Sequence, residues 1–507
     1  MPTSKWLITI LLLGFFFTLY VTFFPFDFFL KELPTIPEII QTFDDEFVAY
    51  FSAKDVLRNV ILFMPIGFGL AGILLKIGCN KVVVFFFTLF TGVLFSTGIE
   101  FLQIFSISRF PTFYDVLANS VGAGLGTIIF IRWGNMSYQS WLNLSHWLDN
   151  KLSFRSLFTA YMLFVFTLLS LTIYLQRQLS FNNWTTNFPL ILGNEYTENR
   201  SWNGFLTDVY LFDEALGVED LEILLSGKRP YSIQNRDLIA SYNFTDNEAS
   251  NFPAIEWVGT PALGRESEGA LFSQGQWLVS EEGGRLISRH LRETNEFTVG
   301  LIGAPINIEQ RGPARIVSIS ASFVQRNLTI GQSNNDLNLR IRTPFSDENG
   351  RYPEFVFPDV FVDNNLQYII ITYTGSSIHL FINNVDNHYV LEPLPAVLLF
   401  SLLHPTTIKQ IRINPGNTII FRLLYAALFL VPLAGLLVYK LRKNDNTARR
   451  NWFVLFSFTL LAPVVLEGIL VLLLSRYAFA IHNLWIYMIM FLLAVAYIWW
   501  LTRPSPL

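Results

Sequence analysis

The stretch that decides the fold class runs from Ser96 to Gly126 and reads STGIEFLQIFSISRFPTFYDVLANSVGAGLG. Both of its ends are apolar enough for a lipid bilayer, yet polar and ionisable residues recur in its middle: Glu100, Gln103, Arg109, Asp115 and Asn119. An ionisable side chain inside a membrane is costly unless it faces protein or water. The stretch therefore indicates a polar cluster between membrane helices.

The composition of the whole chain agrees with a membrane protein. The 507 residues are 52% hydrophobic and only 15% charged, whereas a soluble chain of this length is usually more charged. The net charge of −4 argues against a nucleic-acid partner. The lone cysteine, Cys79, excludes an internal disulfide framework. The six histidines are scattered without the spacing of metal ligands, so we expect neither a metal site nor a cofactor.

The apolar stretches predict about eight membrane spans, because one span needs about 20 apolar residues. The first could be a cleaved signal peptide, but its apolar run is long and no small-residue cleavage site follows it, which favours an uncleaved anchor. The predicted spans are Trp6–Phe24, Val56–Ile77, Val82–Phe105, Phe113–Trp133, Leu157–Leu175, Thr418–Lys440, Trp452–Leu474 and Leu484–Leu501.

The distribution of basic residues predicts the orientation of these spans. Lys5, Lys76 and Lys81, and the basic residues of the later loops, all fall on one side if the N-terminus is cytoplasmic. We therefore expect both termini in the cytoplasm and the segment between the fifth and sixth spans outside. Residues Ser137–Asn150 predict an interfacial helix on the cytoplasmic surface, with an ordinary loop as the alternative.

Residues 176–416 differ from the rest, because they are more polar and contain short alternating runs typical of β-strands. Thr374–Ser376 reads TGS, a turn that predicts a hairpin between two of these runs. We predict an all-β sandwich between five helices in residues 1–175 and three helices in residues 417–507. The predicted strands are Ala314–Phe323, Leu337–Thr343, Gln367–Tyr373 and Ser377–Asn383.

The strands of this predicted domain resemble the laminin-G/concanavalin A-like jelly roll. The resemblance rests on Arg315–Thr343 and Gln367–Asn384, and on Trp202–Leu225, which is similar to the closing strand and short helix of that fold. Here the closing piece precedes Asp237–Asp246, which resembles an opening strand. We therefore predict a circularly permuted jelly roll. Many such domains bind carbohydrate or calcium, although no ligand pattern in this chain compels either.

Three acid–amide pairs predict how the polar cluster is built. Each pair is spaced three or four residues apart, hence on one helical face, and the predicted orientation places all three near the outer side of the membrane. Arg109 follows in the loop between the third and fourth spans. The pairs are Asp55 with Asn59, Glu100 with Gln103, and Asp115 with Asn119.

A structural interpretation of these residues remains open. Asp55 and Asp115 lie near the starts of their helices, where an acid caps the helix and favours its dipole. Glu100 fits this interpretation worst, because it lies near the C-terminal end of a helix. Gly122 and Gly126 form a small-xxx-small face for close packing. Pro65 with nearby glycines predicts either a bend that opens room beside the cluster or ordinary helix packing.

The polar residues, together with LFMPIGF at Leu62–Phe68 and the glycines that follow Asn119, resemble the VanZ-like membrane proteins over roughly Trp6–Trp133. The family is associated with resistance to the glycopeptide antibiotic teicoplanin in some bacteria. The resemblance implies a protein of the bacterial plasma (inner) membrane with its polar motif near the outer face. This chain departs from the family by carrying the predicted jelly roll and three further helices.

Two classes of function follow from these patterns. In the first, a pocket binds a membrane lipid or a lipid-linked envelope precursor, and the outer domain binds a surface glycan. In the second, a membrane enzyme acts on a lipid-linked phosphate or saccharide, with Glu100 and Asp115 sharing acid and base work. No serine or cysteine nucleophile motif accompanies the cluster. The predicted ligand-binding residues are Asp55, Asn59, Glu100, Gln103, Arg109, Asp115 and Asn119.

Overall fold

The computed structural model of the protein describes residues 2–28, 53–106, 111–234, 236–245, 251–259, 269–406, 408–443 and 448–503. The chain divides into two compact units. The first comprises Met1–Phe166, Ala426–Val464 and Ile481–Leu507, and the second comprises Thr167–Tyr425 and Val465–Ala480. We call them the helical unit and the β unit.

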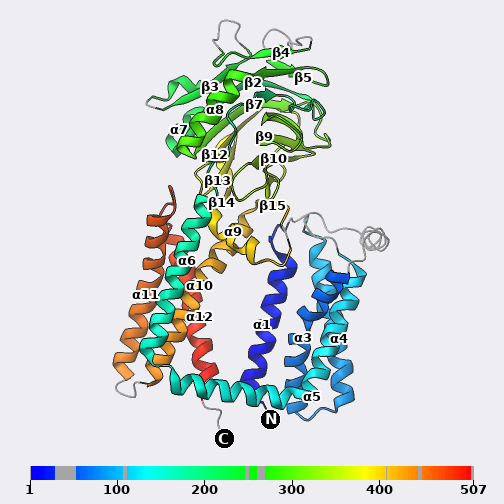
Figure 1. The fold of residues 1–507 in the computed structure, drawn as a ribbon, viewed down its shortest axis with the longest axis vertical. Coiled ribbons are helices and arrows are strands. Elements are labelled where there is room, and N and C mark those ends of the chain that lie inside the picture. Colours follow the sequence, from blue (N-terminus) through cyan, green and yellow to red (C-terminus); the bar gives the residue numbers. More distant parts are fainter. Residues whose placement is uncertain are drawn as a thin grey trace. The chain divides into compact units, whose positions relative to one another are not determined.

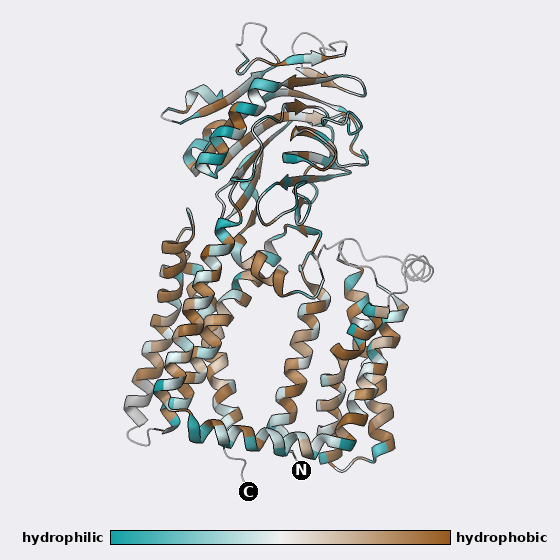
Figure 2. Cartoon of the chain, in the orientation of Figure 1, coloured by the Kyte–Doolittle hydropathy of each residue, from teal (hydrophilic) through white to brown (hydrophobic). Residues whose placement is uncertain are grey.

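Eight helices in the described residues are long and apolar enough to cross a membrane. All eight coincide with predicted spans, and hydrophobic residues run along each of them (Figure 2). These helices are α1 (Ser4–Phe23), α3 (Ala53–Lys76), α4 (Lys81–Gln103), α5 (Phe113–Lys151), α6 (Phe154–Arg177), α10 (Pro415–Lys443), α11 (Ala448–Leu473) and α12 (Ile481–Thr502).

Helix α5 is longer than the sequence predicts. It continues for 39 residues and includes Ser137–Asn150, so the prediction of a helix in this segment is confirmed and the alternative of a loop is wrong. Its interfacial position stays a prediction. The junction contains Gly134, and a single glycine lowers helix stability without ending a helix. Trp141, Leu144 and Trp147 on this part are each about half exposed, as expected for a side that faces lipid.

Helices α3 and α5 pack with their backbones almost in contact. A Cβ atom added to Gly122 would lie 2.2 Å from the carbonyl oxygen of Val60, and one added to Gly126 would lie 2.1 Å from that of Met64. A Cβ added to Gly67 of α3 would lie 1.9 Å from the carbonyl oxygen of Ala123. These glycines therefore form the close-packing face predicted from their spacing.

The glycines near Pro65 serve packing and do not open a space. A Cβ added to Gly69 would lie 2.9 Å from the Cβ of Leu11, so this glycine admits α1 just as Gly67 admits α5, although less closely. Pro65 lies inside α3, which continues through it. Of the two interpretations of this segment, the structure favours ordinary helix packing.

The β unit contains two sheets that account for its strands (Figure 1). The strand order is β15-β11-β10-β9-β8-β1-β6-β4 in one sheet and β14-β13-β12-β7-β2-β3 in the other, where β5 pairs with β2. The first sheet contains β1 (Leu190–Leu192), β4 (Glu256–Val258), β6 (Trp277–Ser280), β8 (Ala314–Ser320), β9 (Arg326–Ser333), β10 (Asp336–Ile341), β11 (Glu354–Phe357) and β15 (Gln410–Arg412). The second contains β2 (Gly204–Phe212), β3 (Leu238–Asn243), β5 (Ala270–Phe272), β7 (Phe297–Pro305), β12 (Gln367–Tyr373), β13 (Ile378–Ile382) and β14 (Asn384–Leu391).

The four strands predicted from alternation correspond to β8, β10, β12 and β13. Strands β12 and β13 form the predicted antiparallel hairpin, with Tyr373 opposite Ile378. Strand β2 pairs with β3 on one side and with the later strand β7 on the other, as the permuted order requires. The identity of the sandwich as a jelly roll stays a prediction.

In the described residues, three α-helices accompany the sheets: α7 (Val218–Leu225), α8 (Glu281–Thr294) and α9 (Leu394–Leu403). A short 3₁₀ helix spans Pro230–Ser232. Helix α8 begins at the cap Ser280, whose side chain accepts a hydrogen bond from the backbone N–H of Gly283 at 2.9 Å. It ends at Asn295, which takes the left-handed conformation that closes many helices.

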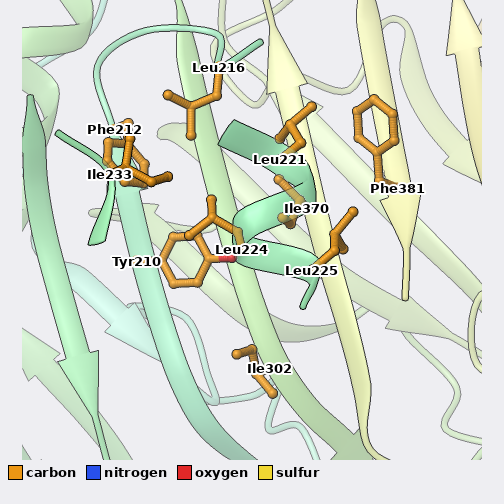
Figure 3. Packing of buried hydrophobic residues seen from close by; sticks show 10 residues of the cluster. All are labelled: Tyr210, Phe212, Leu216, Leu221, Leu224, Leu225, Ile233, Ile302, Ile370 and Phe381. Atoms are coloured by element: carbon orange, nitrogen blue, oxygen red, sulfur yellow. The ribbon is translucent and has the colours of Figure 1, made fainter. Parts of the chain in front are cut away.

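Helix α7 is held to the second sheet by a buried apolar cluster (Figure 3). Leu221 and Leu224 of the helix are 2% and 1% exposed, and they meet side chains from β2, β7, β12 and β13. Full burial of such a side chain contributes roughly 1.5–3 kcal/mol. The cluster comprises Tyr210, Phe212, Leu216, Leu221, Leu224, Leu225, Ile233, Ile302, Ile370 and Phe381.

A buried ion network ties the segment after β1 to β8 and β9. Glu195 accepts hydrogen bonds from Arg315 at 2.9 Å and from Arg326 at 2.9 Å and 3.0 Å, and all three side chains are at least 96% buried. Burial by itself would raise the pKa of Glu195, but the hydrogen bonds and charges of Arg326 and Arg315 outweigh it and lower the pKa to about 2. Glu195 is therefore ionised at neutral pH.

Candidate functional site

The predicted polar residues lie in the helical unit, where α3, α4 and α5 meet. Two of the side-chain hydrogen bonds that join these helices involve predicted site residues. The Asn59 amide of α3 donates to a carboxylate oxygen of Asp115 of α5 at 2.6 Å. The Asn119 amide of α5 donates to the hydroxyl of Ser96 of α4 at 2.8 Å. The close glycine packing of α3 on α5 brings the first pair within reach.

Glu100 is the most deeply buried acid of the predicted cluster. Glu100 is only 2% exposed, and one of its carboxylate oxygens accepts a hydrogen bond from the backbone N–H of Thr112 at 2.9 Å. Thr112 also caps α5, because its hydroxyl accepts a hydrogen bond from the backbone N–H of Asp115 at 3.2 Å. Glu100 and Asp115 are close enough for their charges to act on each other.

Two amides of the cluster have buried oxygens without a hydrogen-bond partner. The Gln103 amide donates to the carbonyl oxygen of Thr22 in α1 at 3.0 Å, but its own oxygen accepts nothing from the described residues. The Asn119 oxygen is likewise buried and accepts nothing from them. Gln103 and Ser96 are seven residues apart on α4, so these two amides differ in depth by about 10 Å.

Asp55 lies at the edge of the cluster. Its side chain is 51% exposed and forms an ion pair with Arg58, one turn further along α3, at 2.7 Å. Arg58 and Asp55 are both within electrostatic reach of Asp115. The predicted cation of the cluster, Arg109, lies outside the described residues.

The structure changes how the predicted pairs connect. The sequence places an acid and an amide on one face of each helix, but the amide hydrogen bonds described above go to other helices. Asn59 bonds to Asp115 and not to Asp55, and Gln103 bonds to α1 and not to Glu100. The acid and the amide of one pair project side by side from the same helix. The amide N–H therefore points toward an acceptor on the neighbouring helix more easily than toward the acid one turn away on its own helix.

The capping interpretation applies only in part. Asp115 lies in the first turn of α5, but Thr112 is its N-cap. Asp55 lies in the first turn of α3, where an acid favours the helix dipole. Glu100 lies in the last turn of α4, and the backbone N–H of Thr112 in the next segment supplies its hydrogen bond.

Sequence reasoning missed a further buried acid beside the cluster. The hydroxyl of Ser106 donates to a carboxylate oxygen of Asp27 at 2.5 Å, and these residues are 5% and 2% exposed. Their segments also pair, because Phe28 and Ser106 form an isolated antiparallel bridge. The signal was present in the sequence as an acid in PFD, directly after the first apolar run. Ser96 and Thr112 were also missed, because hydroxyl residues are common in membrane helices and turns.

No group of three or more His, Cys, Asp or Glu side chains in the described residues is placed to hold a metal ion. The described cluster instead offers carboxylates, amide oxygens and hydroxyls. Such groups recognise a polar ligand through hydrogen bonds.

Comparison with known proteins addresses the segment that holds this cluster. Residues 7–134 match the model of the family described as VanZ/LLP1. The match contains every predicted site residue and supports a VanZ-like membrane segment, which is typical of a bacterial envelope membrane protein. It covers about a quarter of the chain and leaves out the β unit. Neither the curated proteins nor the solved structures include a match to this chain.

Proposed function

We propose that the VanZ-like segment binds the head group of a lipid or lipid-linked envelope precursor through its polar cluster. In this proposal the protein lies in the bacterial plasma membrane with both termini in the cytoplasm, and the cluster opens toward the outer leaflet. The β unit would lie outside and bind a surface glycan.

The observation that carries the proposal is the pair of buried amide oxygens, of Gln103 and Asn119, that find no hydrogen-bond partner among the described residues. A buried polar atom that lacks its hydrogen bond costs roughly 1–3 kcal/mol. Two such oxygens on α4 and α5, the helices between which Glu100 is buried, are therefore unusual in a purely structural contact, where evolution can replace them by apolar groups at little cost. All three groups accept hydrogen bonds, so they favour a ligand rich in donors, such as the hydroxyls of a saccharide.

The cations of the segment would recognise the phosphate of such a ligand. A guanidinium matches a phosphate with two parallel hydrogen bonds. Arg109 is the first candidate by its place in the sequence, between Glu100 and Asp115. Arg58 is a second, because it is 32% exposed and lies beside Asp55 at the edge of the cluster.

Binding is tested with the full chain reconstituted in lipid nanodiscs. A polyprenyl-phosphate-linked saccharide is titrated, and native mass spectrometry measures the fraction of the protein that carries it. We expect Glu100→Gln and Arg109→Gln to weaken binding at least about tenfold, the loss typical of one charge-assisted hydrogen bond. Asp149→Asn is the matched control, because Asp149 is an exposed acid at the far end of α5. Unchanged binding by both cluster variants would refute the proposal.

A membrane enzyme is the second candidate, and the proximity of Glu100 to Asp115 favours it. The two carboxylates have different surroundings, since Glu100 accepts a backbone N–H and Asp115 an amide of another helix. Unlike surroundings allow one carboxyl to act as acid and the other as base. The same nanodiscs are incubated with the lipid-linked saccharide and its products are followed by mass spectrometry. Turnover that Glu100→Gln abolishes and Asp149→Asn spares would establish catalysis.

Glycan binding by the β unit is tested separately on the full chain. Labelled protein in nanodiscs is applied to an array of bacterial surface glycans, with empty labelled nanodiscs as the control. Selective binding to one glycan class supports the lectin-like role. Signals equal to those of empty nanodiscs across the array contradict it.

A further inference from the structure

A cavity with polar and apolar walls lies in the β unit, which does not contain the cluster of the VanZ-like segment. Its volume is about 380 Å³. It forms where the last turn of α6, the end of α11 and the end of α8 come together, and its lining includes Ile173, Arg177, Ser180, Glu296, Leu473 and Ser475. No function discussed above uses these residues.

The walls of this cavity are fixed by hydrogen bonds between its elements. The side-chain amide of Gln176, oriented to satisfy both neighbours, donates to the carbonyl oxygen of Leu473 and accepts from the backbone N–H of Ser475, each at 2.9 Å. The backbone carbonyl of Ser475 in turn accepts a hydrogen bond from the hydroxyl of Ser376. The ends of α6 and α11 are therefore held together beside the hairpin between β12 and β13.

The acid of the cavity is already neutralised. Glu296 forms an ion pair with Arg476 at 2.8 Å, accepts a hydrogen bond from the hydroxyl of Ser475 at 3.4 Å, and is 87% buried. Arg476 also holds the carbonyl oxygen of Ala215 at 2.6 Å. Glu296 is therefore occupied by partners within the protein.

Arg177 is a cation of the cavity that no described carboxylate pairs with, although the C-terminal end of α6 favours its charge. It is the last residue of α6 and exposed, and no acid in the described ranges forms an ion pair with it. The hydroxyl oxygen of Ser180 on the next turn is buried and lacks a hydrogen-bond partner among the described residues. Arg177 and Ser180 both line the cavity, whose acid is already occupied, so a guanidinium and a hydroxyl remain there as possible donors to an anion.

The remaining wall of the cavity is apolar. Ile173 and Leu473 belong to the final turns of two helices that are apolar enough to span a membrane, and Ile173 is 36% exposed. An anion that also carries a hydrocarbon chain would satisfy both parts of the wall. A free inorganic anion would leave Ile173 and Leu473 without a partner.

We propose that this cavity binds the phosphate head group of a membrane lipid, with Arg177 and Ser180 holding the phosphate and Ile173 and Leu473 contacting the start of the acyl chain. Arginine suits this task because its planar guanidinium presents two parallel donors to phosphate oxygens. Such a lipid would bridge the ends of α6 and α11. The proposal does not depend on ligand binding by the VanZ-like cluster.

The test uses the full chain in a detergent that carries no phosphate. Dioctanoyl phosphatidylglycerol, sn-glycerol 1-phosphate and inorganic phosphate are titrated in parallel, and hydrogen exchange by mass spectrometry locates each effect. We expect the lipid to protect residues 173–180 and 473–476. Glycerol phosphate and inorganic phosphate should bind at least about tenfold more weakly, because they lack the apolar contacts.

Variants at the two ends of α6 separate this site from general membrane attraction. Arg177→Gln should weaken lipid binding at least about tenfold, and Arg177→Lys should retain most of it. Arg155→Gln is the matched control, since Arg155 is an exposed arginine in the first turn of the same helix. Equal binding by Arg177→Gln and the natural chain, equal loss in Arg155→Gln, or protection that maps to other residues would each overturn the proposal. If inorganic phosphate binds as tightly as the lipid, the proposed contacts of Ile173 and Leu473 with the acyl chain are wrong.

Discussion

The substitution Gly122→Ala tests whether close packing of α3 on α5 holds the polar cluster in place. The added Cβ would lie 2.2 Å from the carbonyl oxygen of Val60, and real Cβ atoms essentially never approach closer than 3.0 Å. The obstacle is backbone, so no side-chain rotation relieves it and the helices must separate by about 0.8 Å. Overpacking of this kind costs about 2 kcal/mol, or about thirtyfold in the folding equilibrium.

Unfolding of the full chain by increasing fractions of sodium dodecyl sulfate in mixed micelles measures this cost. Gly124→Ala is the matched control on the same helix, because its added Cβ would meet its nearest neighbour at an ordinary 3.5 Å. We expect Gly124→Ala to be neutral or slightly stabilising, since alanine favours a helix by up to about 1 kcal/mol over glycine.

The same separation should loosen the hydrogen bond between Asn59 and Asp115, because Asn59 is adjacent to Val60 in the chain. Asn59→Leu should therefore cost less in the Gly122→Ala background than in the natural chain. We expect a coupling of about 1 kcal/mol in the double-mutant cycle. Equal stability of the Gly122→Ala and Gly124→Ala variants, or strictly additive costs in the cycle, would refute the link between packing and the cluster.

Three further predictions concern single contacts. Asn59→Leu by itself should destabilise the chain by about 1–3 kcal/mol in the same micelle assay, because it leaves Asp115 without its 2.6 Å partner, and a neutral result would mean that water replaces the amide. Because the pKa of Glu195 is lower in the folded chain than its ordinary value of 4.5, its ionisation stabilises the β unit at pH values above 4.5, and this stability should be lost as the pH falls toward about 2. Hydrogen exchange in β8 and β9, corrected for intrinsic rates, should show the loss. Glu195→Gln should cost about 3 kcal/mol at neutral pH and remove that pH dependence, whereas an unchanged profile would assign it to other groups. Leu224→Ala should cost about 3 kcal/mol in chemical denaturation of the β unit within the full chain, because the side chain is 1% exposed, while Val218→Ala on the same helix, 58% exposed, should cost less than about 0.5 kcal/mol.

Residue spacing predicted part of the candidate site. The types and order of Asp55, Glu100, Asp115 and their amides predicted that α3, α4 and α5 share a polar region, and the family match covers the same segment. Spacing did not reveal that Asn59 bonds across to Asp115, or that Thr112 serves both Glu100 and the start of α5. Such links depend on which backbone lies opposite, and that is a property of two helices together.

The sequence by itself determined the eight apolar helices and four strands of the β unit, β8, β10, β12 and β13, because these depend on local hydrophobicity and its period along the chain. It also determined the face that Gly122 and Gly126 share. Only the tertiary structure decided that this face meets the carbonyl oxygens of α3, and that β2 lies between β3 and β7. It also placed Glu195 between Arg315 and Arg326. These pairings join residues far apart in the chain, and they are selected by shape and charge complementarity once the elements pack.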